Sequence, residues 1–116
     1  MTKYNLEERT SEFGKRIILF CKSLEKDIIT TPLIKQLLRS GTSIGANYAE
    51  ANGASSKRDF RNKIFLCKKE SQETKYWLDM ISVAIPSRKQ EAQEIWQEAQ
   101  ELTLIFQKIT SSLKNQ

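Results

Sequence analysis

The sequence predicts an all-α fold, an antiparallel up-and-down four-helix bundle formed by one domain over residues 1–116. Four long segments carry apolar residues at every third or fourth position, which is the period of one helical face. Short stretches with proline, glycine or serine separate these segments, and short connections make consecutive helices antiparallel neighbours. No segment alternates apolar and polar residues as a half-buried strand does.

The first helix is expected over residues 5–24. Asn5 is a good N-cap, and Glu7 and Glu8 lie in the first turn, where the helix dipole favours negative charge. Gly14 lies mid-helix and weakens it by about 1 kcal/mol relative to alanine. The expected apolar face consists of Leu6, Phe13, Ile17, Phe20, Cys21 and Leu24.

The second helix is expected over residues 32–52, with Thr31 as N-cap and Pro32 in the first turn, where its missing N–H costs nothing. Gly53 is the expected C-terminal stop. Small residues at every fourth position allow another helix to approach closely: Gly41, Gly45 and Ala49. The apolar side is expected to hold Ile34, Leu37, Leu38, Ile44 and Tyr48.

The third helix is expected over residues 57–84, opened by Ser56 with Asp59 three positions later. Its apolar seam has heptad spacing: Phe60, Ile64, Cys67, Ser71, Thr74, Leu78 and Ile81. Pro86 breaks the chain, and the fourth helix is expected over residues 88–114. Its seam has the same spacing: Ala92, Ile95, Ala99, Leu102, Phe106, Ile109 and Leu113.

The composition indicates a cytoplasmic protein. Its longest apolar run, residues 17–21, is too short to span a bilayer, and the N-terminus lacks the layout of a secretory signal. Cys21 and Cys67 each lie in an apolar stripe, so we expect two buried reduced thiols rather than a disulfide or a redox pair.

The chain contains no histidine, which removes the commonest general base and the commonest metal ligand. Candidate nucleophiles such as Ser43 and Ser71 therefore lack an activating base. We expect no catalytic residues, no metal site, no cofactor and no enzymatic activity. Glu70 and Glu73 lie one turn apart, and we expect them to form ion pairs with Lys63, Lys69 or Lys75.

The net charge of +5 favours a polyanion only weakly, but its distribution yields candidate nucleic-acid contacts. One set of basic residues lies on the third helix, and a second set lies on the first helix. The competing interpretation is a solvated face that Asp59, Glu70, Glu73 and Asp79 partly neutralise. The candidate residues are Lys57, Arg58, Arg61, Lys68, Lys69 and Lys75, with Lys15, Arg16 and Lys22 as the second row.

Several apolar residues lie off the predicted core faces, and a helix that is apolar on more than one side usually buries the second side against a partner. We therefore expect self-association. These residues are Ile18, Leu19, Leu33, Phe65, Leu66, Tyr76, Met80, Trp96, Leu104 and Ile105.

Residues 40–81 contain the strings SIGANYAEA and KYWLDMI, and residues 6–17 read LEERTSEFGKRI. These strings resemble the four-helix bundle proteins first noticed in intervening sequences of bacterial 23S ribosomal RNA genes. The resemblance covers most of the chain. Its structural signature corresponds to Ser43, Gly45, Asn47, Tyr48, Glu50, Asp59, Phe60, Lys63, Glu70 and Trp77.

The resemblance implies a ring-like homopentamer and no known enzymatic activity. It also implies kinship with the accessory variability protein of diversity-generating retroelements, a basic pentamer that binds nucleic acid and associates with a reverse transcriptase. A ring would repeat any basic row around its circumference and so multiply a weak contact. The partners implied are further copies of this chain, RNA or DNA, and a reverse transcriptase or another protein, with no membrane.

The leading functional hypothesis is a non-catalytic oligomer that binds an RNA or DNA backbone through its basic helix faces. The alternative is an oligomeric scaffold for a protein partner, in which the lysines serve only solubility.

Overall fold

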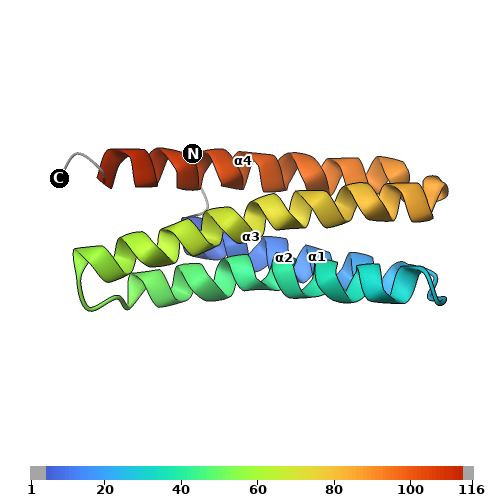
Figure 1. Ribbon diagram of the computed structural model, residues 1–116, viewed down its shortest axis with the longest axis horizontal. Coiled ribbons are helices and arrows are strands. Elements are labelled where there is room, and N and C mark those ends of the chain that lie inside the picture. The colour runs from blue at the N-terminus through green and yellow to red at the C-terminus, as the bar shows by residue number, and fades with distance from the viewer. Residues whose placement is uncertain (1–4, 114–116) are drawn as a thin grey trace.

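The computed structural model describes residues 5–113, which form four α-helices and one short 3-10 turn and contain no strand. The helices are α1 (Leu6–Ser23), α2 (Thr30–Asn52), α3 (Lys57–Ala84) and α4 (Lys89–Leu113), and the turn η1 (Pro86–Arg88) precedes α4. All four run along one long axis in alternating directions (Figure 1). The predicted up-and-down bundle is therefore confirmed, although position 114, the predicted end of the last helix, lies outside the described residues.

Two of the four helices begin with the N-cap that the sequence predicts. The Asn5 side chain accepts a hydrogen bond from the Glu8 N–H at 2.8 Å, and the Ser56 hydroxyl accepts one from the Asp59 N–H at 3.0 Å. Each satisfies an N–H that has no partner within the helix. Gly53 ends α2 as predicted, with its N–H donating to the Glu50 carbonyl at 3.1 Å.

The start of α2 was predicted wrongly. Thr31 is not its N-cap, because the helix begins at Thr30, two residues before the predicted start. Asp27 satisfies the first amides instead: its carboxylate accepts hydrogen bonds from the N–H groups of Ile29 and Thr30, both at 2.8 Å. Pro32 remains in the first turn, where it leaves no helical hydrogen bond unmade.

The predicted apolar seams meet in one core. The seams of α3 and α4 are buried except near their ends, where Phe60, Ile109 and Leu113 are half-buried. Leu38 is the exception in α2, since it is 39% exposed. Each helical residue is rotated by about 100° from the one before it, and Leu37 already points into the core, so Leu38 points away from it. Both cysteines are buried and reduced, as predicted.

The helices α1 and α2 approach closely at glycines. A β-carbon added at Gly45 would lie 3.2 Å from the Thr10 carbonyl oxygen, and one at Gly41 would lie 2.7 Å from a γ-carbon of Ile17. The predicted role of these two small residues in packing is confirmed. Ala49, the third small residue of that stripe, is exposed.

Of the ten apolar residues predicted to lie off the core faces, six are exposed. The other four are partly buried, and two of these, Leu33 and Trp96, pack against the core, whereas Met80 and Ile105 do not. The exposed six are Ile18, Leu19, Phe65, Leu66, Tyr76 and Leu104. No helix within residues 5–113 is long and apolar enough to cross a membrane.

Candidate nucleic-acid interface

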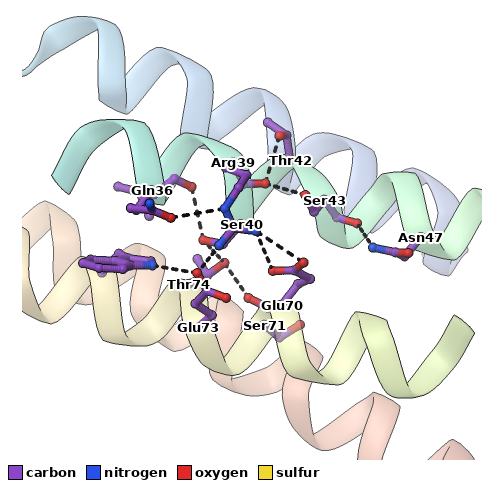
Figure 2. Close-up of polar contacts among 12 residues, drawn as sticks. Gln36, Arg39, Ser40, Thr42, Ser43, Asn47, Glu70, Ser71, Glu73 and Thr74 are labelled. Atoms are coloured by element: carbon purple, nitrogen blue, oxygen red, sulfur yellow. Dashed lines mark hydrogen bonds and ion pairs between the residues drawn. The ribbon is translucent and has the colours of Figure 1, made fainter. Parts of the chain in front are cut away.

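The side of α3 that faces α2 is a polar seam in which one arginine joins two carboxylates (Figure 2). Arg39 of α2 donates to Glu70 at 3.3 Å and pairs with Glu73 as well. The predicted ion pairs of these glutamates with lysines of α3 are therefore wrong. Of those lysines, Lys63 reaches back to Glu50 of α2 at 2.8 Å.

Buried hydroxyls extend this seam into the core. Thr74 donates to the Glu70 carbonyl at 2.7 Å and lies 3.0 Å from the Ser40 hydroxyl, and both side chains are buried. The Trp77 indole N–H donates to the Glu73 carboxylate at 3.0 Å. This hydrogen bond and the nearby Arg39 guanidinium lower the pKa of Glu73. The α2 side of α3 is thus internally neutralised.

The side of α3 that faces α4 carries the basic residues. Lys57, Arg61, Lys68 and Lys75 follow at intervals of four, seven and seven, which places them within about 40° of one another at about 100° per residue. We call these four residues the basic row. Among residues 5–113, no carboxylate lies within ion-pair distance of any of them.

Two members of the basic row are held in place by neutral groups. The Lys75 ammonium donates to the Gln100 side chain and lies 5.2 Å from the centre of the Trp96 ring, both on α4. The Arg61 guanidinium lies 5.4 Å from the centre of the Phe65 ring. Its Nε is buried and has no hydrogen-bond partner. These contacts order the two cations without cancelling their charge.

The other two predicted cations of α3 lie elsewhere on the helix. Arg58 and Lys69 are exposed and lie about 90° around the helix from the basic row, on its outward face. The candidate residues of α3 therefore form two adjoining rows rather than one.

The second predicted row, on α1, is interrupted by carboxylates. Arg16 lies 3.8 Å from Glu94 of α4, and Lys15 lies 3.8 Å from Glu12. Lys22 is exposed in the last turn of α1. Because acidic neighbours accompany two of its three members, the α1 row presents less uncompensated charge than α3 does.

The resemblance signature maps mainly onto contacts that hold the bundle together. Ser43 and Asn47 bond back to carbonyls of α2, at 2.6 Å to Arg39 and 2.9 Å to Ser43. The Tyr48 ring lies 6.2 Å from that of Phe106, centre to centre. The remaining members take part in contacts described above: Gly45, Glu50, Asp59, Phe60, Lys63, Glu70 and Trp77.

Side chains that could bind a metal do not gather anywhere in the described part of the chain: no three of Cys, Asp and Glu lie together. Both cysteines are protonated thiols at neutral pH, because burial raises the pKa of Cys21 to about 11 and that of Cys67 to about 12.

The comparisons with known proteins agree with this architecture. The protein-family model described as "23S rRNA-intervening sequence protein" matches residues 2–108 of this chain. The chain belongs to this family.

A solved structure has the same fold. This is the crystal structure at 1.70 Å of a protein with unknown function from the S23 ribosomal protein family of Bacteroides thetaiotaomicron. The two sequences are 32% identical, the match covers 91% of this chain and 98% of that one, and the TM-score is 0.81. No curated protein matches the chain.

Proposed function

We propose that this protein is a non-catalytic, homo-oligomeric nucleic-acid-binding protein that holds a phosphate backbone along the basic row of α3. One observation carries the proposal. Of the six arginines, four form ion pairs with glutamates, namely Arg9, Arg16, Arg39 and Arg88. The two without an ionic partner in residues 5–113, Arg58 and Arg61, both lie on α3 beside unpaired lysines.

This sorting of charge favours a polyanion over a solvated surface. A helix whose cations serve only solubility gains by pairing them with carboxylates of its neighbours, as the α2 side of α3 does. The α4 side instead places neutral groups, Gln100 and Trp96, beside its lysine. Cations kept unpaired in a row are the arrangement that displaces counterions from a nucleic-acid backbone.

Assembly of several copies would strengthen such a weak row by avidity. Exposed apolar side chains in the second half of α1 and the loop after it supply a candidate contact between copies. They are Ile18, Leu19, Ile28 and Ile29, exposed by 41%, 66%, 89% and 63%. The family resemblance supports a ring of five. We place this oligomer in the cytoplasm, where two reduced thiols are stable.

Fluorescence anisotropy of a labelled RNA 20-mer, titrated with protein between about 50 and 200 mM salt, tests the proposal. Neutralising three cations of the basic row, in K57Q/R61Q/K68Q, is expected to weaken binding at least tenfold. It should also flatten the salt dependence by about 0.7 in log–log slope for each phosphate that the variant no longer neutralises. The matched control, K35Q/K89Q/K108Q, changes the net charge equally on other surfaces and should bind nearly as the wild type does.

Equal losses of affinity in the two variants would show that net charge, and not the row, drives binding. Unchanged binding in K57Q/R61Q/K68Q, with helicity intact, would refute the assignment. Mass photometry of L19E tests the oligomer separately, because a charge at that position is expected to lower the particle mass if α1 joins the copies.

A further inference from the structure

The outward face of α3 repeats three chemical types in the same order. At spacings of four, three, four, three and four residues, it presents a cation, an amide and an aromatic ring, then the same three types again. All six side chains are exposed, the two rings by 37% and 53%. We call this set the outward stripe: Arg58, Asn62, Phe65, Lys69, Gln72 and Tyr76.

The polar side chains of the outward stripe make no hydrogen bond or ion pair within the described residues. Within residues 5–113, no hydrogen bond or ion pair engages Arg58, Asn62, Lys69 or Gln72. This contrasts with the opposite flank of the same helix, where every glutamate has a partner from α2. Their exposure therefore leaves donors and acceptors available to a ligand.

Each of the two rings contacts a neighbouring side chain of α3. The Arg61 guanidinium covers the Phe65 ring at 5.4 Å. Trp77 packs edge-on against Tyr76, with ring centres 4.9 Å apart and planes at 78°, and its indole is fixed by the hydrogen bond to Glu73. Exposed rings held in this way lose little conformational freedom when a planar ligand stacks on them.

We propose that the outward stripe binds a single-stranded nucleic acid, with bases stacked on Phe65 and Tyr76 and phosphates paired with Arg58 and Lys69. Tyr76 lies eleven positions after Phe65, which is about 16.5 Å along the helix at 1.5 Å per residue. That distance is several times the stacking distance of about 3.4 Å, so the rings contact different nucleotides of one strand.

Selectivity for single strands follows from the chemistry of the stripe. In a duplex the bases are stacked on each other and their Watson–Crick edges are paired, so neither ring finds a free base face. An unpaired strand offers both faces and edges, and every base has a face that stacks on an aromatic ring. The amides Asn62 and Gln72 lie between cation and ring, where an exposed base edge would be.

This inference rests on the proposed function and specifies its ligand. The test uses the full chain and three probes of one mixed sequence without self-complementarity: a 20-mer RNA, the same 20-mer as DNA, and the DNA duplex. At about 100 mM salt, the single strands are expected to bind at least tenfold more tightly than the duplex. The variant F65A/Y76A should lose at least tenfold in affinity for the single strands, because each stacked base contributes about that much.

The affinity of F65A/Y76A for the duplex should fall several times less than its affinity for the single strands, because the variant keeps all four cations of the basic row and removes only the Phe65 ring that orders Arg61. The matched control is V83A/L104A, which trims two exposed apolar side chains, 76% and 57% exposed, without removing a ring. It should bind all probes as the wild type does. The same comparison between the RNA and DNA 20-mers decides whether the ribose hydroxyl contributes.

Three results would overturn the inference: equal affinity of the wild type for strand and duplex, single-strand binding unaffected by F65A/Y76A, or a lower particle mass of F65A/Y76A, which would make the stripe a contact between copies. Salt-sensitive duplex binding under the first two results would leave the proposed function standing. Absence of binding to every probe would remove the proposed function itself.

Discussion

Arg9 of α1 and Glu98 of α4 form a bidentate ion pair: the arginine Nε and one terminal nitrogen each donate to a separate carboxylate oxygen at 2.8 Å. The same terminal nitrogen donates to Glu101 at 2.7 Å. The pair joins the first and last helices, whose backbones approach less closely than those of consecutive helices (Figure 1). Charge-assisted hydrogen bonds therefore link the two neighbouring helices whose backbones approach each other least closely.

Removing the Arg9–Glu98 pair should destabilise the protein measurably. Both side chains are about one quarter exposed, so solvent screens them only in part. We expect E98Q to lower the free energy of unfolding by about 1–2 kcal/mol, with a similar coupling energy in a cycle of R9Q, E98Q and the double variant. Urea denaturation measures both quantities.

The control for this prediction is E94Q, which alters the looser contact with Arg16 at 3.8 Å between more exposed side chains. It should change stability by no more than a few tenths of a kcal/mol. Equal effects of E94Q and E98Q would show that the bidentate geometry contributes nothing of its own.

Glu73 should make stability depend on pH in the acidic range. The hydrogen bond from Trp77, together with Arg39, lowers the pKa of this carboxyl in the folded protein. A lowered folded pKa gives stability that is complete above the unfolded pKa of about 4.3 and is lost as the pH falls through the folded value. The variant W77F keeps a ring but removes the donor, so the pKa of Glu73 should rise towards its ordinary value.

Carbon-detected NMR titration of the glutamate carboxyls follows this shift directly. The variant E73Q should lose less stability than the wild type between pH 7 and pH 3, since its side chain has no proton to gain. A Glu73 pKa that stays low in W77F would assign the shift to the neighbouring cations, Arg39 and Lys69.

The helices and their buried faces were predictable because they depend on local spacing. A seam such as Ile64, Cys67 and Ser71 points to one side of a helix whatever the helix packs against, and four such seams define a bundle. Caps of the type at Asn5 and Ser56 are equally local. The capping role of Asp27 was not predicted, because Thr31 followed by Pro32 is the stronger sequence signal for a helix start. Both Asp27 and the Thr31-Pro32 pair lie at the start of the same helix.

Contacts between helices were predicted less well, because they depend on how far one helix is shifted along another. Glu70 and Glu73 have lysines nearby in sequence, and only the register of α2 against α3 brings Arg39 between them. The same holds for Arg16, which sequence places in a basic row and packing places beside Glu94. The unpaired state of the α3 cations is likewise a property of the assembled bundle.

The buried cysteines should react only through opening of the fold. Cys67 is fully buried with its thiol 3.6 Å from the Ile44 carbonyl, and burial raises its pKa to about 12. Little thiolate exists at pH 8, and a disulfide reagent has no path to it. In C21A, whose one thiol is Cys67, labelling by Ellman's reagent should be slow in buffer and accelerate steeply with urea. Fast labelling of folded C21A would contradict the burial of this residue.

Two glycines should respond to the same substitution with opposite sign. A β-carbon at Gly14 meets no atom nearer than 3.8 Å, so G14A gains helix propensity without strain and should stabilise the protein by up to about 1 kcal/mol. A β-carbon at Gly41 would lie 2.7 and 2.9 Å from the two γ-carbons of Ile17, a fully buried side chain that has no room to move away. We expect G41A to destabilise by about 1–3 kcal/mol despite the same gain in propensity. Thermal and urea denaturation of the two variants side by side measures this contrast, and stabilisation by G41A would show that α1 and α2 can separate at this contact without cost.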